Sequence, residues 1–170
     1  MRRVAVIASA SGCGKTTVGQ ALAARLEVPF VELDALHHGP GWTEATAEEL
    51  RARVEPVVGT DAWVIDGAYR EKLGDLVLGA ADTVVWLDVP VRTWLPRLLR
   101  RTFRRIVRRE ELWSGNRETL RGAFVGRDAF LPFTFRNYRR RRRLYPEQLA
   151  RFNVVRLRSQ AEVDRFLRGL

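Results

Sequence analysis

The sequence predicts an α/β protein in which helices cover both faces of a parallel sheet. Short β-branched or apolar runs alternate along the chain with longer stretches of helical periodicity, and a glycine-rich loop follows the first run. The chain has 170 residues, 46% of them apolar and 29% charged, which suits one domain with its own core. Strands separated by helices imply right-handed β-α-β crossovers and an open three-layer α/β/α sandwich.

The first half of the chain is predicted to hold three strands and two helices. Thr46 and Glu49 have the spacing of a capping box, which opens a helix. The predicted elements are a strand over 3–8, a helix over 15–26, a strand over 30–33, a helix from 46 to about 58 and a strand over 63–65.

The second half adds two strands around a long helical region. The pattern predicts a strand over 83–87, a helix-rich region from 91 to about 149, a strand over 153–157 and a closing helix over 161–167. The chain has no internal repeat and no long polar linker. It is therefore predicted to be a single domain over 1–170, with additions to the sheet over 34–60 and about 92–143.

The basic residues are concentrated in one part of the chain. The formal net charge is +10, whereas residues 92–143 hold 17 arginines and four acidic residues, a net charge of +13. The remaining chain is therefore close to neutral. Only two of the 30 basic residues are lysines, Lys15 and Lys72, and each is informative because lysine and arginine bind phosphate with different geometry.

Cysteine content and hydropathy indicate the compartment. The single cysteine, Cys13, excludes an intramolecular disulfide, and no apolar run approaches the about 18 residues of a membrane span. These features predict a cytoplasmic protein with no membrane partner.

A glycine-rich loop lies between the first strand and the first helix. Its glycines let backbone N–H groups turn toward one centre, where the helix presents its positive N-terminus. Lys15 is placed to reach the β and γ phosphates of a nucleotide, and Thr16 to ligate Mg²⁺. The alternative is an ordinary strand-to-helix turn. The predicted ATP-binding residues are Gly12, Cys13, Gly14, Lys15, Thr16 and Thr17.

One position departs from the usual phosphate-loop pattern. The pattern G-x-x-x-x-G-K-[ST] has glycine where this chain has Ser9. Serine fits there only if the residue keeps a negative φ.

Other segments support a resemblance to a known family. The segment 64–67 with Arg70, V-I-D-G and then R, is similar to the D-G-F-P-R segment of adenylate kinases, although Ala68 and Tyr69 replace Phe and Pro. The stretch 84–101 is similar to the entry into the lid of those enzymes. The chain thus resembles the P-loop nucleoside monophosphate kinases. The segment 33–42, with L-D-A-L and P-G-W, is similar to adenylate-kinase-like proteins called DNA topology modulation proteins.

The resemblance implies a fold and a reaction. The fold is a five-stranded parallel sheet of order 2-3-1-4-5 with an arginine-rich helical lid over about 92–143, and the reaction is phosphoryl transfer from ATP with Mg²⁺. The resemblance leaves the acceptor open.

Two aspartates at strand ends compete for the metal. Asp66 ends the third strand beside the loop, where a carboxylate holds Mg²⁺ directly or through water, so Thr16 and Asp66 are the predicted metal ligands. The alternative for Asp66 is a residue of an Asp-Gly turn. Asp88 also ends a strand and ranks second, because Asp-Val-Pro more often opens the helix leading to the lid.

The acceptor is expected near Asp34 and Arg70. Asp34 follows the second strand, and ligands of such sheets sit at the carboxyl ends of strands. It is expected to orient an acceptor hydroxyl, act as base or share the metal; a cap is the alternative. Arg70 would bind an anionic acceptor, unless it is a surface arginine. His37 and His38 adjoin Asp34 but do not predict a zinc site.

Arg97 and Arg101 lie four residues apart, so a helix places them on one face. The resemblance implies that residues at these spacings stack on adenine and neutralise the transferring phosphate, and the alternative is a solvated helix face. The segment 111–118 is the predicted lid tip, where Arg117 either swings in on closure or stays exposed. Most of the run 139–143 is predicted to be solvated. The segment 158–161 resembles a loop that contacts adenine.

Two classes of function follow. The first is a small-molecule kinase in which ATP binds residues 12–17 and the catalytic residues are Lys15, Asp34, Arg97 and Arg101. The second is a nucleic-acid-associated ATP-binding protein, or a polynucleotide kinase, whose basic region 92–143 tracks phosphates while its aromatic residues stack on bases.

Overall fold

The computed structural model describes residues 1–119, 122, 124 and 129–170. Its centre is a five-stranded sheet of order β2-β3-β1-β4-β5, and every pair of neighbouring strands is parallel. This confirms the predicted topology. The strands are β1 (Arg3–Ala8), β2 (Phe30–Glu32), β3 (Trp63–Asp66), β4 (Thr83–Leu87) and β5 (Val154–Leu157).

Helices of very different length connect the strands. The capping box of Thr46 and Glu49 is present, with both hydrogen bonds formed. The helices are α1 (Lys15–Leu26), α2 (Leu33–His37), α3 (Ala47–Val58), α4 (Arg70–Leu73), α5 (Leu76–Ala80), α6 (Val91–Arg108), α8 (Phe130–Gln148) and α9 (Gln160–Arg168), with short 3-10 turns η1 (Pro40–Trp42) and η2 (Trp113–Gly115). No described helix is long and apolar enough to cross a membrane.

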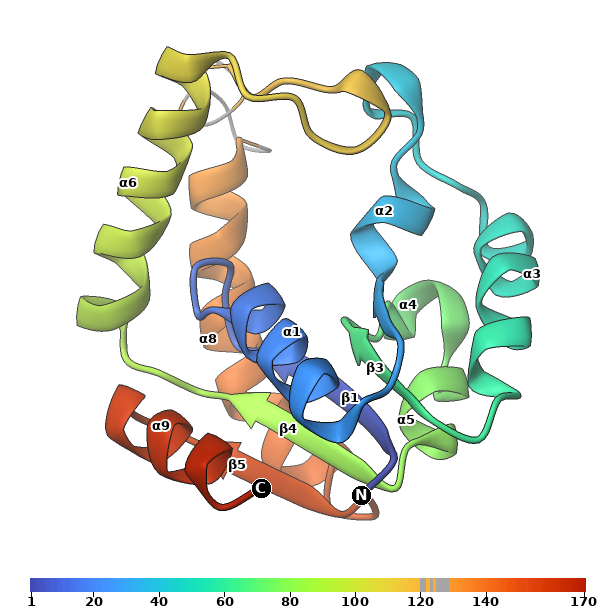
Figure 1. Cartoon of the computed structure of the whole chain (residues 1–170). Helices are drawn as coiled ribbons and strands as arrows, with labels where there is room; N and C mark the ends of the chain where they lie inside the picture. Colours follow the sequence, from blue (N-terminus) through green and yellow to red (C-terminus); the bar gives the residue numbers. More distant parts are fainter. Residues whose placement is uncertain (120–121, 123, 125–128) are drawn as a thin grey trace.

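The sheet is buried on both faces, which explains why its strands read as continuous apolar runs. Alternate residues of β1 enter two separate cores: Val4 and Val6 pack with α1 and α9, while Ala5 and Ile7 pack with α3, α4 and α5. Figure 1 shows these helices on opposite sides of the sheet, with both termini at the same end. The three-layer architecture is as predicted.

The described part of the basic region, residues 92–143, lies over the carboxyl ends of the strands. Helix α6 rises from the end of β4, the chain crosses at the top, and α8 descends behind the sheet (Figure 1). The crossing chain meets the segment that follows α2, because η1 and η2 are in contact. Residues 120–121, 123 and 125–128 of the predicted lid lie outside the described residues.

Candidate active site

The loop between β1 and α1 requires glycine at two positions. Gly12 has φ 84°, and a Cβ atom there would lie 2.7 Å from the Trp94 carbonyl oxygen. Gly14 has φ 94° and caps α1 in the left-handed region. Because both conformations favour glycine, the sequence G-x-G-K-T folds here as a tight turn whose N–H groups lead into the helix N-terminus.

Ser9 is accommodated at the first position of the loop. It lies outside the left-handed region, as expected for a serine in place of glycine. Its fully buried hydroxyl donates to Asp88 Oδ1 at 2.8 Å and accepts from Trp86 Nε1 at 3.0 Å. The serine thus connects the start of the loop to the end of β4.

Lys15, Thr16 and Asp66 form a cluster at the end of β3. Lys15 Nζ donates to Asp66 Oδ1 at 2.5 Å, and Thr16 Oγ1 donates to Asp66 Oδ2 at 2.7 Å. Mg²⁺ prefers oxygen ligands and is held by one or two carboxylates together with substrate phosphates. The hydroxyl and carboxylate of Thr16 and Asp66 fit that donor set. The described residues contain no group of three His, Cys, Asp or Glu side chains that could hold a metal by themselves.

Glu32, at the end of β2, is a site residue that the sequence analysis missed. Its carboxylate accepts from Trp113 Nε1 at 3.4 Å and lies 3.4 Å from Thr16 Oγ1, whose single proton goes to the closer Asp66. Burial raises the pKa of Glu32, and the charges of Asp66 and Asp34 raise it further. A sequence signal existed, because Glu32 ends a strand beside the loop in the same way as Asp66.

Asp34 is paired with a tyrosine rather than with an arginine. The Tyr69 hydroxyl donates to Asp34 Oδ1 at 2.6 Å, and no described residue hydrogen-bonds to Oδ2. Tyr69 has φ 44°, a left-handed conformation that costs a bulky residue free energy and persists only where its surroundings hold it. Its ring packs 4.6 Å from that of His37, and burial raises the pKa of Tyr69 strongly.

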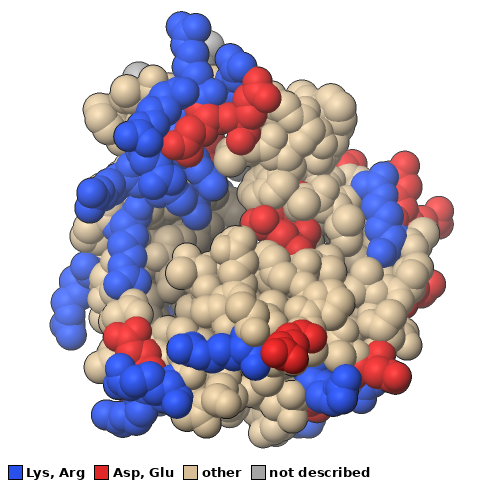
Figure 2. Space-filling view, in the orientation of Figure 1, with Lys and Arg blue, Asp and Glu red and all other residues tan. Residues whose placement is uncertain are grey.

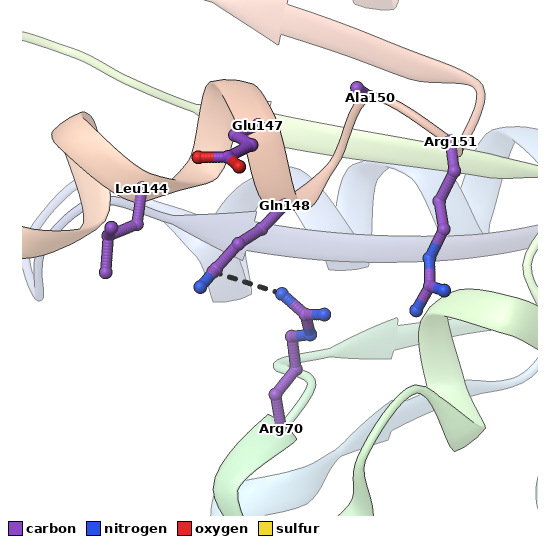
Figure 3. Close-up of a pocket in the computed structure, with 6 residues that line it drawn as sticks. All are labelled: Arg70, Leu144, Glu147, Gln148, Ala150 and Arg151. Carbon is purple, nitrogen blue, oxygen red and sulfur yellow. Dashed lines mark hydrogen bonds between the residues drawn. The ribbon is translucent and has the colours of Figure 1, made fainter.

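Arg70 lies away from Asp34. Its guanidinium pairs with Asp75, with Nε at 2.8 Å and Nη2 at 2.7 Å from Oδ1, and its Nη1 donates to Gln148 at 3.1 Å. Figure 3 shows Arg70 directed toward the last turn of α8, in a hollow of about 450 Å³ that also borders Arg151. The structure therefore does not bring the two predicted acceptor residues together.

Asp88 binds side chains that surround the glycine loop. Its buried carboxylate is bonded by Arg156 from β5 at 2.6 Å and by Arg142 from α8 at 3.0 Å, in addition to Ser9. Arg156 also lies over the Trp86 ring, 4.1 Å from its centroid. With these partners, Asp88 is less available to a metal than Asp66.

Arg97 and Arg101 occupy different surroundings on α6. Arg97 is exposed and donates to Gln160 at 2.9 Å, so it meets the predicted adenine loop 158–161. Arg101 is half-buried, and the carboxylates of Glu118, Asp34 and Glu32 act on its charge. Its Nε is buried with no partner among the described residues, and burial lowers the pKa of Arg101.

The lid tip is docked on the segment that follows α2. Buried Asn116 accepts from the Trp42 N–H at 2.8 Å and donates to the Gly39 carbonyl at 2.9 Å and to the Trp113 carbonyl at 2.8 Å. Ser114 Oγ donates to the His38 carbonyl at 2.9 Å. These bonds join the two loops to each other.

Aromatic rings line the same junction. Trp113 is stacked on His38 with centroids 5.7 Å apart, and Trp42 meets both rings edge-on. Neither Trp42 nor Trp113 was singled out from the sequence as a site residue. Figure 2 shows basic side chains over α6, acidic side chains near the middle of the same face, and a hollow between them.

The remaining predicted residues lie at the periphery. Arg117 is exposed and pairs with Glu111 at 2.5 Å. In the run 139–143, four arginines are exposed, as predicted, while the half-buried Arg141 donates to the Ala8 carbonyl at 3.3 Å. Burial raises the pKa of Cys13 to about 11, so its thiol stays neutral inside the loop.

Comparisons with known proteins identify the fold. A family model for shikimate kinase matches residues 11–40, which include the loop and Asp34. No curated protein sequence shows a significant match. The chain is similar in structure to shikimate kinase from Acinetobacter baumannii in complex with shikimate (TM-score 0.58, 20% identity, 99% of this chain and 90% of that chain). The fold is that of the P-loop kinases.

Two further structures support the same fold. A gluconokinase from Sinorhizobium meliloti 1021 matches with TM-score 0.53 and 19% identity over 99% of this chain and 94% of that chain. Deoxyadenosine kinase from M. mycoides with bound dCTP matches with TM-score 0.51 and 13% identity over 98% and 97%. Because these P-loop kinases bear different names, the fold leaves the acceptor of this chain open.

Proposed function

We propose that this chain is an ATP-dependent kinase that transfers the γ-phosphoryl group of ATP to a small acceptor. The observation that carries the proposal is the cluster in which Lys15 and Thr16 both donate to Asp66 at the end of the glycine loop. A cation, a hydroxyl and a carboxylate at a helix N-terminus are the groups that bind a nucleotide triphosphate and its metal.

The residues of the loop have separate tasks. The N–H groups of residues 12–17 surround the phosphates, and Lys15 leaves Asp66 to neutralise the β and γ oxygens. Thr16 and Asp66 would hold Mg²⁺, which supplies charge neutralisation on the phosphates when bound. Arg97 lies beside the segment expected to contact adenine.

Asp34 acts on the acceptor. Tyr69 donates to one carboxylate oxygen and leaves Oδ2 without a hydrogen bond from a described residue, so Oδ2 is the oxygen that would receive the hydroxyl proton. The acceptor oxygen forms a bond to the γ phosphorus, the bond from that phosphorus to ADP breaks, and the proton passes to Asp34. Arg101, with its unpartnered Nε, would stabilise the charge on the group in transfer.

The docked lid would keep water away from the phosphoryl group, which otherwise hydrolyses ATP. This role agrees with the hydrogen bonds that join η1 to η2. The closer resemblance to topology modulation proteins and the cytoplasmic setting stay predictions, as does the nucleic-acid alternative, for which the described site offers no specific observation.

The test is ADP formation from ATP-Mg²⁺ with a panel of acceptors, run beside nucleotide-dependent thermal stabilisation. We expect ATP-Mg²⁺ to raise the Tm and one acceptor class to drive ADP formation. Arg101→Ala should lower kcat by about 100-fold, as expected for a residue that acts only on developing charge. Arg97→Ala, beside the segment expected to contact adenine, should instead raise the KM for ATP. A chain that neither binds ATP nor forms ADP would refute the proposal.

A further inference from the structure

We infer that the acceptor is a polyhydroxyl ring compound of the sugar or nucleoside class that carries no phosphate or carboxylate group. The inference rests on the proposed function and concerns the space between Asp34, Tyr69 and the docked loops 38–44 and 111–117. It narrows the sequence-based expectation, a nucleotide or another small acceptor that is anionic or carries a hydroxyl group, to the uncharged hydroxyl-bearing compounds.

The cations on the acceptor side are all committed to protein groups. Residues 34–75, which the structure describes completely, contain four cationic side chains, those of Arg51, Arg53, Arg70 and Lys72. Arg53 donates to the Leu36 carbonyl at 2.6 Å. Arg51 donates to the Leu73 carbonyl at 3.3 Å and to Glu55 at 3.4 Å.

Lys72 and Arg70 have shorter contacts to carboxylates than Arg51 has. Lys72 donates to Glu44 at 2.9 Å and to the Ala45 carbonyl at 2.8 Å. Arg70 makes two bonds to Asp75 and one to Gln148, in the hollow of Figure 3. An anionic acceptor bound by a cation of residues 34–75 would have to break one of these sets, because phosphate or carboxylate recognition needs a free fork or ammonium.

Three carboxylates gather beside the acceptor space. Glu32 and Asp66 lie 3.4 and 2.7 Å from the Thr16 hydroxyl, and Asp34 follows Glu32 by two residues. The two cations beside these carboxylates already have tasks in the proposed reaction: Arg101, on whose charge Asp34 and Glu32 act, stabilises the phosphoryl group in transfer, and Lys15 neutralises the β and γ oxygens. A second anion on the acceptor would therefore meet carboxylates, and like charges brought together cost several kcal/mol.

The neutral groups suit a hydroxyl-bearing ring. Asp34 Oδ2 accepts a hydroxyl hydrogen, and the Tyr69 oxygen has a further lone pair for a second one. Trp113, partly exposed, presents its ring beside Glu32, with His38 and Trp42 packed next to it. Aromatic faces and a few fixed polar groups are typical of sites for small ring compounds.

The experiment compares paired acceptors that differ only in charge. ADP formation and thermal stabilisation are measured with ATP-Mg²⁺ and, in each pair, with adenosine against AMP, deoxycytidine against dCMP, and glucose against glucose 6-phosphate and gluconate. Related hexoses and pentoses are added to the panel as further uncharged acceptors, and aminosugars as cationic ones. We expect the preferred acceptor to belong to the uncharged or cationic set and to exceed its anionic partner by about tenfold or more in kcat/KM.

Variants separate the inference from the proposed function. Asp34→Asn should lower kcat with the preferred acceptor by about 100-fold while the thermal shift with ATP-Mg²⁺ persists. Arg70→Ala should change the acceptor KM by no more than about twofold, because its guanidinium lies at Asp75. Preference for an anionic partner, or a KM that rises steeply in Arg70→Ala, would overturn the inference and leave the kinase intact. Failure of every uncharged and cationic acceptor to react or stabilise would also overturn it.

Discussion

Lys15 and Asp66 are bonded to each other at 2.5 Å across the mouth of the glycine loop. The ammonium and the carboxylate hold one another in place, and Asp66 is almost fully buried while Lys15 stays partly exposed. In the proposed function, a nucleotide with its metal would exchange this pair for two new ones, ammonium to phosphate and carboxylate to metal. The pair thus keeps both groups in position before any ligand arrives.

Replacement of Lys15 should remove phosphoryl transfer. Lys15→Ala takes away the ammonium that neutralises the β and γ oxygens, and we expect kcat to fall by about 100-fold or more. Lys15→Arg should be nearly as damaging, because a planar guanidinium is too wide for a point-charge site. The measurement is ADP formation at saturating ATP. Arg139→Ala, which removes one exposed cation from α8, is the matched control, and retained turnover in either Lys15 variant would exclude the loop as the catalytic one.

Asparagine variants of Asp66 and Asp88 should differ in the property that they change: Mg²⁺ dependence for Asp66 and stability for Asp88. Asp66→Asn should weaken Mg²⁺ dependence, measured as activity against Mg²⁺ concentration, and leave the Tm close to that of the wild type. Asp88→Asn should act mainly on stability, by about 1–3 kcal/mol, because Arg142 and Arg156 lose their charged partner. The opposite ranking would exchange the metal and structural roles of the two strand ends.

Replacement of Ser9 by the glycine of the usual loop pattern should lower the free energy of unfolding. Ser9→Gly leaves the buried Asp88 Oδ1 and Trp86 Nε1 without the hydroxyl that bonds both. We expect a loss of about 1–3 kcal/mol in the free energy of unfolding, measured by urea denaturation. Ser9→Ala should lose a similar amount, since it lacks the same hydroxyl. Equal stability of Ser9→Gly and the wild type would show that water replaces the hydroxyl.

Asn116 should control how well the lid excludes water. Asn116→Ala removes the three hydrogen bonds that join the lid tip to Trp42 and Gly39 and that order η2. We expect acceptor-independent ATP hydrolysis to rise relative to transfer, because an undocked lid admits water. Ser114→Ala, which removes the single bond to the His38 carbonyl, should show a smaller change. An unchanged ratio of hydrolysis to transfer in Asn116→Ala would mean that the docked loops do not exclude water.

His37 should make stability depend on pH. Burial lowers the pKa of His37, and Lys72 and His38 act in the same direction, while Glu44 opposes them. The unfolded chain therefore takes up a proton near pH 6.5 that the folded protein resists. Stability from the neutral ring is fully present above about pH 6.5 and is lost as the pH falls toward the folded-state pKa.

The measurement for His37 is the urea midpoint at about pH 7.5 and at about pH 5.5. The wild type should lose stability at the lower pH, and His37→Gln should lose less because it cannot take up the proton. A variant with the same pH dependence as the wild type would assign the effect to other groups.

Local sequence patterns predicted the main strands and helices and the glycine loop. The boundaries of β1, α1 and β4 agree with the predicted ranges, because an uninterrupted apolar run and a capped helical period are local signals. The loop was equally accessible, since its glycines, Lys15 and Thr16 are neighbours in the chain. The predicted strand over 30–33 ends earlier, because Leu33 already begins α2.

Contacts between distant residues could not be read in the same way. The bond between Asp34 and Tyr69 joins residues 35 apart, and that between Glu32 and Trp113 joins residues 81 apart. Arg70 was expected at the acceptor because of its place in a motif, but the choice of Asp75 over Asp34 depends on the left-handed turn at Tyr69. Tertiary packing, rather than any local preference, determines which side chain reaches the site.

The bond between Asp88 and Arg156 couples the first loop of the chain to its last strand. Ser9, at the start of the glycine loop, donates to Asp88, and Asp88 is buried with the guanidinium of β5. A chain without β5 would lack one of the two guanidinium groups that pair with this carboxylate, and an unpaired buried charge is costly. We therefore expect the glycine loop to reach its folded shape only when the last strand has joined the sheet.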